Sequence, residues 1–285
     1  MQKLLLAEWL LTYEKIVKHR VDAGEIKLKT ATDYRRMVWF CLNHWARKPL
    51  IEISVSDISR AIMEKAYFTP FSARRVRINM SDMFMEAQRA GCIPFGHNPA
   101  LVSREPRAVI QTERLTLDEW LKIFRAAKYA APGYFQTAML LALVTGQRPS
   151  DLIRIHENNI RAGFLHIQQF KTGERIALPL CLRMHAIDTS LEEVIALCDP
   201  GYLLQSRGRQ LNTWTLSRWF RICREQAGIK AIIGTPPPFK EQRSLAERLY
   251  RAQGLDTRTL LGHKSQRMTD LYNDPRGKEY RVLKL

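Results

Sequence analysis

Apolar residues recur every three or four positions through the first hundred residues of the chain, which is the spacing of amphipathic helices. The pattern predicts four such helices, which span residues 4–16, 30–45, 57–63 and 72–90. Ser56 or Asp57 is suited to cap the third helix, and Gly91 is suited to end the fourth. Residues 1–104 are therefore predicted to form one helical domain.

Charged residues replace the apolar pattern over residues 105–115, which is typical of a linker between domains. Thr116 and Glu119 then have the spacing of a capping box, in which the hydroxyl and the carboxylate each bond the other residue's backbone N–H. Residues 116–285 are therefore predicted to form a second domain. A buried helix is expected within it over residues 134–144, where nearly every side chain is apolar.

Two short stretches of the second domain alternate between apolar and polar residues, as half-buried β-strands do. They span residues 164–170 and 175–180, and the turn at 171–173, Lys-Thr-Gly, joins them into a hairpin. An amphipathic helix is expected after the three prolines at 236–238. The fold is thus predicted to be mainly α with a small antiparallel sheet, as a helical domain followed by an α+β domain.

The net charge of the chain indicates what kind of partner it binds. It has 45 Lys and Arg against 28 Asp and Glu in 285 residues, a net charge of +17 with a pI near 9.9. Nucleic acid is the usual partner of such a protein, and a membrane surface is less favoured because no long basic amphipathic helix is present. Arg74, Arg75 and Arg77 interleave with the apolar positions of the fourth helix. We interpret them as a DNA-facing surface, with a merely solvated face as the alternative.

The five cysteines are scattered without close pairs, and the seven histidines show no ligand spacing. This distribution fits a reducing compartment and argues against a disulfide framework or a Cys-rich zinc site. The opening residues make a poor signal peptide, and no apolar run has the length needed to span a bilayer. A cytoplasmic protein is expected, and the absence of a Walker loop argues against a nucleotide cofactor.

Ordered motifs in the second domain carry the candidate chemistry. Residues 145–148 read Thr-Gly-Gln-Arg, and Arg-Ser-Leu-Ala-x-Arg-Leu-Tyr begins at Arg243. Leu-Leu-Gly-His-Lys-Ser contains His263, and Tyr272 follows nine residues after that histidine. Each residue alone has an ordinary interpretation, as a solvated arginine, a structural histidine or a core tyrosine. Together with the Lys-Thr-Gly turn, the set resembles the tyrosine recombinase (phage integrase) family, and within it the integrases of lambdoid phages.

The resemblance implies a role for five residues. Tyr272 corresponds to the nucleophile that attacks a DNA phosphodiester and forms a 3′-phosphotyrosyl bond. Arg148 and Arg243 correspond to the two arginines that clamp the phosphate, a task suited to the planar donor pair of a guanidinium. Lys171 corresponds to the general acid for the leaving 5′ oxygen, and His263 to the histidine that hydrogen-bonds the scissile phosphate.

Two further positions are candidates on weaker grounds. Lys240 lies three residues before Arg243, where the family usually has histidine. Lysine is no neutral base unless its pKa is strongly depressed, so we interpret Lys240 as a phosphate contact. Asp151, three residues after Arg148, is a candidate supporting residue that orients or neutralises groups in the pocket. The alternative for Asp151 is a carboxylate favoured at a helix N-terminus by the macrodipole.

The resemblance also implies how the whole chain acts. Residues 1–104 correspond to the family's core-binding domain and residues 116–285 to its catalytic domain, which together form a C-shaped clamp on double-stranded DNA. Four protomers exchange strands pairwise through a Holliday junction, without a metal or another cofactor. Accessory DNA-bending or directionality proteins are further candidate partners. We recognise no counterpart of the small amino-terminal domain with which lambdoid integrases bind arm sites, so either a simpler recombinase or a truncated chain is expected.

Two other functions fit the same motifs. A type IB topoisomerase shares the chemistry but only relaxes supercoils, so strand exchange between two short duplexes separates the two activities. A non-catalytic DNA-binding regulator would form no denaturant-resistant adduct with DNA. The apolar residues within 276–285 predict either a hook on the chain's own domain or a segment that docks on a neighbouring protomer.

Overall fold

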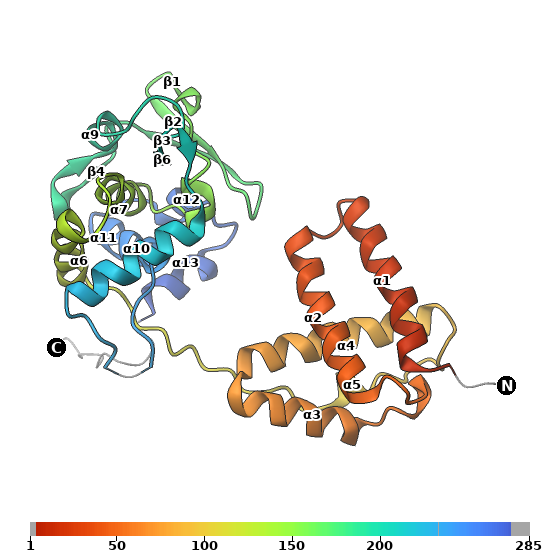
Figure 1. Ribbon diagram of the computed structural model, residues 1–285. Helices are drawn as coiled ribbons and strands as arrows, with labels where there is room; N and C mark the ends of the chain where they lie inside the picture. The colour runs from red at the N-terminus through yellow and green to blue at the C-terminus, as the bar shows by residue number, and fades with distance from the viewer. Residues whose placement is uncertain (1–3, 233, 275–285) are drawn as a thin grey trace, which may run out of the picture. The chain divides into compact units, whose positions relative to one another are not determined.

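The computed structural model describes residues 4–232 and 234–274 (Figure 1). Two compact units divide the chain, Met1–Val109 and Ile110–Leu285. The division falls inside the stretch 105–115 for which the sequence predicts a linker. The hook or docking segment expected at 276–285 lies outside the described residues.

The first unit is built from helices, as the apolar spacing predicts. Its elements are α1 (Leu6–Asp22), α2 (Leu28–Trp45), the short 3-10 helix η1 (Leu50–Glu52), α3 (Val55–Phe68), α4 (Pro70–Arg89) and α5 (Pro99–Val102). α1 packs on α2, and α4 contacts α1, α2, α3 and α5. Their apolar faces enclose a core in which Trp9, Tyr13 and Phe84 are almost completely buried.

The third helix begins earlier than the sequence pattern predicts. Its cap is Ser54 and not Ser56 or Asp57. The Ser54 hydroxyl accepts a hydrogen bond from the Asp57 N–H at 3.1 Å, and the Asp57 carboxylate accepts one from the Ser54 N–H at 2.8 Å. This is a capping box, whose acid lies three residues inside the helix. The prediction was wrong because Val55, the first helical residue, is exposed and is followed by the polar Ser56 and Asp57, so the buried apolar pattern begins only at Ile58.

The second unit combines helices with a small antiparallel sheet. Its helices are α6 (Leu117–Ala130), α7 (Tyr134–Thr145), α8 (Pro149–Leu152), α9 (Leu191–Ala196), α10 (Thr213–Gln226), α11 (Glu241–Ala252), α12 (Thr257–Leu261) and α13 (Gln266–Asn273). The sheet has the order β1 (Ile160–Arg161), β2 (Phe164–Gln168) and β3 (Arg175–Pro179), and β2 pairs with β3 through the predicted hairpin turn. Two short hairpins add β4 (Arg183–Met184) with β5 (Thr189–Ser190), and β6 (Gln205–Ser206) with β7 (Arg209–Gln210). The predicted fold class is confirmed.

Helix α7 is the central element of the second unit. It is apolar on all sides, and it contacts α6, α8, α9, α10 and α11. Gly146 ends α7 with a φ of 63°, in the left-handed conformation that favours glycine. A Cβ at this position would lie 3.2 Å from Leu261 Cδ2. The end of α7 therefore lies directly against α12, which precedes His263 in the chain.

Part of the predicted linker belongs to the second unit. The Glu113 N–H donates to the Thr235 carbonyl at 2.9 Å, and the Thr235 N–H donates to the Gln111 carbonyl at 3.1 Å. The predicted capping box then forms, with the Thr116 hydroxyl accepting from the Glu119 N–H at 3.2 Å and the Glu119 carboxylate accepting from the Thr116 N–H at 2.8 Å. Across residues 4–232 and 234–274, no helix is both long and apolar enough to cross a bilayer.

Candidate active site

A pocket of about 670 Å³ lies in the second unit where the N-termini of α8 and α11 meet α13. Four of the predicted site residues line it, namely Arg148, Lys240, Arg243 and Tyr272. They come from segments that are nearly a hundred residues apart in the sequence. Lys171 and His263 are not among the lining residues, although His263 contacts Arg243 behind the pocket.

Arg243 is the buried cation of the pocket. Its side chain is 3 % exposed and donates to the Gly146 carbonyl at 2.8 Å and to the Leu261 carbonyl at 2.6 Å. Within the described part of the chain it has no ion pair, and its Nε lacks a hydrogen-bond partner. Burial, and then the nearby charge of Arg148, lower the pKa of Arg243 to about 10. A buried guanidinium held only by neutral groups is suited to receive an anion.

Arg148 is held at the start of α8. Its backbone is extended, and Pro149 occupies the first helical position. One terminal nitrogen of Arg148 donates to Gln169 Oε1 at 2.7 Å and lies 3.9 Å from the Asp151 carboxylate. The guanidinium is only partly exposed, so it faces the pocket with a fixed orientation.

Asp151 is buried, and its carboxylate joins α8 to the base of the β2–β3 turn. One of its oxygens accepts a hydrogen bond from the Phe170 N–H at 2.9 Å. The other lies 3.9 Å from Arg148 and has no hydrogen-bond partner among the described residues. The carboxylate thus lies near Arg148 and also in the first turn of α8, so the orienting role and the macrodipole alternative both stay predictions.

His263 stacks on the ring of Tyr272. The ring centroids are 5.3 Å apart and the planes differ by 28°. His263 Nε2 lies 3.1 Å from a terminal nitrogen of Arg243, and its Nδ1 lies 2.9 Å from the Thr269 hydroxyl. Because a guanidinium only donates, Nε2 is the acceptor and the proton is on Nδ1. Burial, and then the charges of Arg243 and Arg148, lower the pKa of His263 to about 4, so this ring is neutral at pH 7.

Tyr272 is half-buried, in the last turn of α13. The Arg243 guanidinium carbon lies 5.8 Å from the centre of its ring. The Ser244 hydroxyl donates to the Tyr272 carbonyl at 2.9 Å, which fixes α13 against α11. The phenol is thus held beside the buried cation.

The two lysines are exposed residues. Lys240 is the cap residue of α11, and it lines the pocket. Lys171 is at the tip of the β2–β3 turn, which is closed by a bond from the Gly173 N–H to the Gln169 carbonyl at 2.8 Å. The structure therefore brings four of the predicted catalytic residues together with Arg243, and the sixth, Lys171, is on the β2–β3 turn.

Sequence reasoning missed several residues that support this site. Gln147 and Gln169 are buried and hydrogen-bonded beside the two arginines. Arg114, in the predicted linker, donates to Glu241 at 3.1 Å, to the Leu271 carbonyl at 2.5 Å and to the Asp274 carbonyl at 3.0 Å. It therefore holds the end of α13 that carries Tyr272. Nothing in the local sequence around a glutamine or an arginine indicates that its side chain will bond to a residue far away in the chain.

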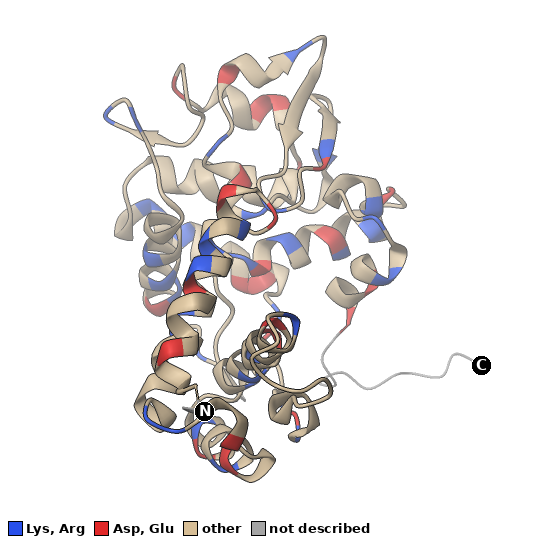
Figure 2. Ribbon diagram, turned by 90° about the vertical axis from the view of Figure 1, so that its right-hand side faces the viewer, with Lys and Arg blue, Asp and Glu red and all other residues tan. Residues whose placement is uncertain are grey.

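The three arginines predicted to face DNA differ in their surroundings. Arg77 is buried and donates to the Ser103 carbonyl at 2.6 and 2.9 Å and to the Leu101 carbonyl at 2.8 Å. The prediction was wrong for this residue, because its guanidinium satisfies the C-terminal carbonyls of α5. Arg74 is ion-paired with Glu105, and Arg75 is exposed. Lys and Arg positions are spread over both units, with Asp and Glu positions among them (Figure 2).

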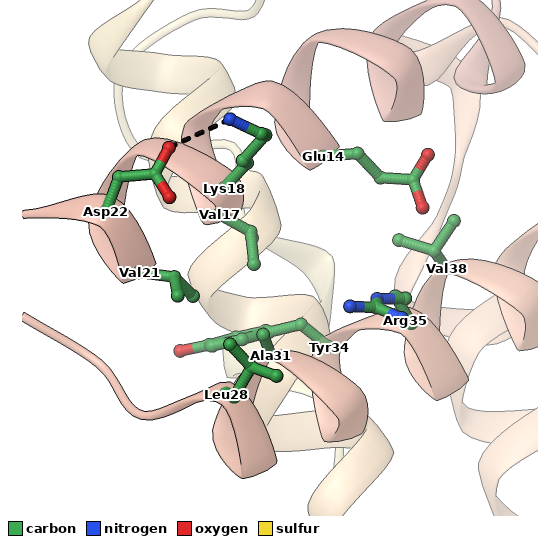
Figure 3. A pocket seen from close by; sticks show the side chains of 10 residues that line it. All are labelled: Glu14, Val17, Lys18, Val21, Asp22, Leu28, Ala31, Tyr34, Arg35 and Val38. Carbon is green, nitrogen blue, oxygen red and sulfur yellow. Dashed lines mark hydrogen bonds and ion pairs between the residues drawn. The ribbon is translucent and has the colours of Figure 1, made fainter. Parts of the chain in front are cut away.

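A second cavity, of about 360 Å³, opens between α1 and α2 of the first unit (Figure 3). Its wall combines apolar side chains such as Val17 and Leu28 with the ion pair of Lys18 and Asp22, at 2.9 Å. None of the predicted site residues lines it. Within the described ranges, no three His, Cys, Asp or Glu side chains are grouped so that they would hold a metal ion.

The chain is similar to several known proteins. Residues 113–279 match the model of the phage integrase family. The chain is 42 % identical over 283 residues to the prophage integrase IntE of Escherichia coli K12, which covers 95 % of this chain and 75 % of that protein. A crystal structure of a lambda integrase dimer bound to a COC′ core site matches with a TM-score of 0.91 and 34 % identity, over 99 % of this chain and 100 % of that one. A lambda integrase tetramer bound to a Holliday junction matches with a TM-score of 0.92 and 33 % identity, over 99 % of this chain and 81 % of that one.

Proposed function

Because this chain belongs to the phage integrase family, we propose that it is a site-specific tyrosine recombinase that cuts and rejoins duplex DNA through a 3′-phosphotyrosyl intermediate. The observation that carries the proposal is the buried Arg243, which has no ion pair among the described residues, with Arg148 and Tyr272 on the same pocket. A phosphodiester is the anion that two guanidiniums and a phenol would engage together.

The residues divide the chemical work as follows. The oxygen of Tyr272 gives up its proton to water and bonds to phosphorus, while the bond from phosphorus to the 5′ oxygen breaks. Arg148 and Arg243 stabilise the added negative charge on the non-bridging oxygens, and one preorganised donor of this kind is worth roughly 10²–10³ in rate. Lys171 gives its proton to the departing 5′ oxygen. Rejoining reverses these steps. Because the phosphotyrosyl bond retains the energy of the phosphodiester, the reaction needs no external energy source.

Lys240 and His263 assist at the phosphate. Lys240, on the pocket wall, contributes a charge-assisted donor. Its ammonium replaces the imidazole that the family usually has, so it acts as a contact and not as the base. His263 supports the Tyr272 ring by stacking, and it lies two residues after Leu261, whose carbonyl accepts from Arg243. To donate to a phosphate oxygen on DNA, Nε2 would carry the proton, and Nδ1 would then accept from the Thr269 hydroxyl.

Double-stranded DNA and further copies of this chain are the proposed partners. The net charge of +17 favours a polyanion. The related lambda integrase is described as a tetramer bound to a Holliday junction and as a dimer bound to a core site. We therefore propose that this chain also acts as a tetramer on synapsed DNA, with Arg75 and Arg74 as DNA contacts of the first unit.

The test uses a nicked suicide duplex, in which a cleaved strand is lost and the covalent intermediate accumulates. The unaltered protein should form a denaturant-resistant adduct, and Tyr272→Phe should form none while it still binds DNA. Tyr202→Phe is the matched control, because it removes a phenolic oxygen from the same unit outside the pocket. An adduct in the Tyr272→Phe variant would show that another residue attacks.

A type IB topoisomerase activity is the second candidate, and the same adduct would support it. The two functions differ in what happens after cleavage. A recombinase transfers the strand to a second duplex that carries the site, whereas a topoisomerase only relaxes supercoils. Relaxation without exchange between two site-bearing duplexes would favour the topoisomerase.

A further inference from the structure

Gln169 has a buried side chain in which every hydrogen-bonding position is occupied. It follows the last residue of β2 and is 1 % exposed. Its Oε1 accepts from Arg148 at 2.7 Å and from the Thr172 hydroxyl at 2.9 Å. Its Nε2 donates to Gln147 Oε1 and to the Leu261 carbonyl, both at 2.9 Å. The guanidinium only donates and the carbonyl only accepts, so these partners fix the orientation of the amide.

The Leu261 carbonyl links this amide to the second arginine. Arg243 donates to the same oxygen at 2.6 Å, and another of its nitrogens lies 3.5 Å from Gln147 Oε1. Gln169 is therefore bonded directly to Arg148 and is one atom away from Arg243. Among the described side chains, only Gln169 bonds directly to Arg148 and shares a carbonyl partner with Arg243.

Gly262 shows how closely the amide is packed against this backbone. A Cβ on Gly262 would lie 2.9 Å from Gln169 Nε2, and its φ of 58° is left-handed. The next residue is His263, which stacks on Tyr272. Displacement of the amide would thus reach the loop that supports the nucleophile.

The turn that carries Lys171 is attached to the same amide. Thr172, the residue after Lys171, donates its hydroxyl to Gln169 Oε1, and the Gly173 N–H donates to the Gln169 carbonyl. A bound phosphate that pulls on Arg148 would therefore pull on the atom that also anchors this turn.

We propose that Gln169 is a positioning residue that aims Arg148, the Leu261–His263 backbone and the Lys171 turn as one unit. The inference rests on the proposed recombinase function and adds to it a coupling between the phosphate clamp and the general acid. If Gln169 were purely structural, its loss would lower stability, and it would reduce cleavage no more than the loss of another buried hydrogen bond does.

The first test replaces Gln169 with methionine, which has a similar shape and forms none of the four bonds. Single-turnover cleavage of the suicide duplex should fall by about 10²-fold, since the aim of a preorganised donor is lost. DNA affinity should stay within about threefold, because contacts to many phosphates dominate it. Tyr250→Phe is the matched control, since it also deletes a buried hydrogen bond, to the Val144 carbonyl at 2.8 Å, away from the pocket. It should lower Tm with cleavage unchanged.

The second test separates the general acid from the clamp. Sulfur in place of the 5′ bridging oxygen makes a leaving group that needs no proton, so it bypasses Lys171. Thr172→Val breaks only the bond to the turn, and its defect should disappear on the sulfur substrate. The Gln169→Met defect should shrink on sulfur but persist, because Arg148 remains misaligned. Equal defects on both substrates for Thr172→Val would overturn the coupling.

A third measurement does not depend on cleavage. Gln169→Met should speed amide hydrogen exchange in peptides from the turn and from residues 258–264, and Tyr250→Phe should not. Unchanged exchange there, or cleavage by Gln169→Met within threefold of the unaltered protein, would overturn the positioning role. Failure of the unaltered protein to form any adduct would instead refute the recombinase function, whatever the exchange shows.

Discussion

Replacing His263 with glutamine should remove a pH dependence of folding that the buried position of this imidazole creates. The ring is 7 % exposed and faces the cationic Arg243, and its pKa in the folded protein is about 4, against 6.5 for an unperturbed histidine. Between these two values the unfolded chain binds the proton and the folded chain does not. The free energy of unfolding therefore falls as pH decreases through this window. Above pH 6.5 the ring is neutral in both states, and no stability is lost to its protonation.

The size of the effect follows from the two pKa values. At pH 5 the proton costs about 2 kcal/mol of stability, and the loss approaches about 3 kcal/mol as pH falls below 4. His263→Gln has no proton to bind at this position. The substitution also costs packing energy, and this cost does not depend on pH. The stability advantage of the unaltered protein over the variant should therefore shrink by about 2 kcal/mol between pH 8 and pH 5.

The assay is urea-induced unfolding of both proteins at several pH values. It is followed by amide exchange of peptides from α7, which report on the second unit alone. The other six histidines are present in both proteins, so their contributions cancel. The histidine Cε1–H resonances give the pKa directly, and the signal that is missing from His263→Gln identifies the ring.

Two results would refute this reasoning. One is a His263 resonance that titrates near pH 6.5, which would mean that the ring is solvated or faces an anion. The other is a stability difference that stays constant from pH 8 to pH 5. In either case the contact between His263 Nε2 and Arg243 would not describe the protein in solution.

Four further expectations can be tested with the same DNA substrates. Lys171→Ala should slow cleavage far more than binding, with recovery on the 5′-sulfur substrate; equal defects on the two substrates would contradict the acid role. Gly262→Ala should lose roughly 1–2 kcal/mol for its left-handed backbone, plus cleavage activity because its Cβ meets Gln169, whereas Gly163→Ala has the same backbone problem with nothing within 4 Å and should keep its activity. Lys240→His should be tolerated and Lys240→Glu should abolish cleavage, and a fully active Glu variant would exclude Lys240 from the phosphate site. The logarithm of DNA affinity should fall with the logarithm of salt concentration by about 0.9 per neutralised phosphate, and a flat dependence would mean that the charge of +17 is not used on DNA.

The local elements of the fold could be predicted because their causes lie within a few residues. The capping box of Thr116 and Glu119, the apolar α7 and the β2–β3 hairpin all formed as predicted. The predicted α3 cap was wrong by two or three residues, since the buried apolar pattern begins only after the first three helical residues. The order of the motifs was also a property of the sequence, and it was sufficient for the family.

What the sequence did not determine was which side chains bond across long separations. Arg77 is the same residue type as Arg74 and Arg75 and lies in the same helix, so the sequence does not distinguish the three. In the structure, only Arg77 of these three is buried against the end of α5. The sequence places Arg114 among the charged residues of the predicted linker. In the structure, its side chain instead bonds to the end of α13. A guanidinium has donors for many partners, and only the packing of the chain decides which carbonyl is near.

The active site itself shows the same division. The sequence by itself determined the residue types of the chemistry, because Arg148, Arg243, His263 and Tyr272 lie in recognisable local motifs. Their convergence was decided by tertiary structure, when α7 packed against α11 and the end of β2 came beside α12. Gln169 became part of the site only through that packing, since an amide acquires a positioning role when a guanidinium and a carbonyl from distant segments are fixed on its two sides.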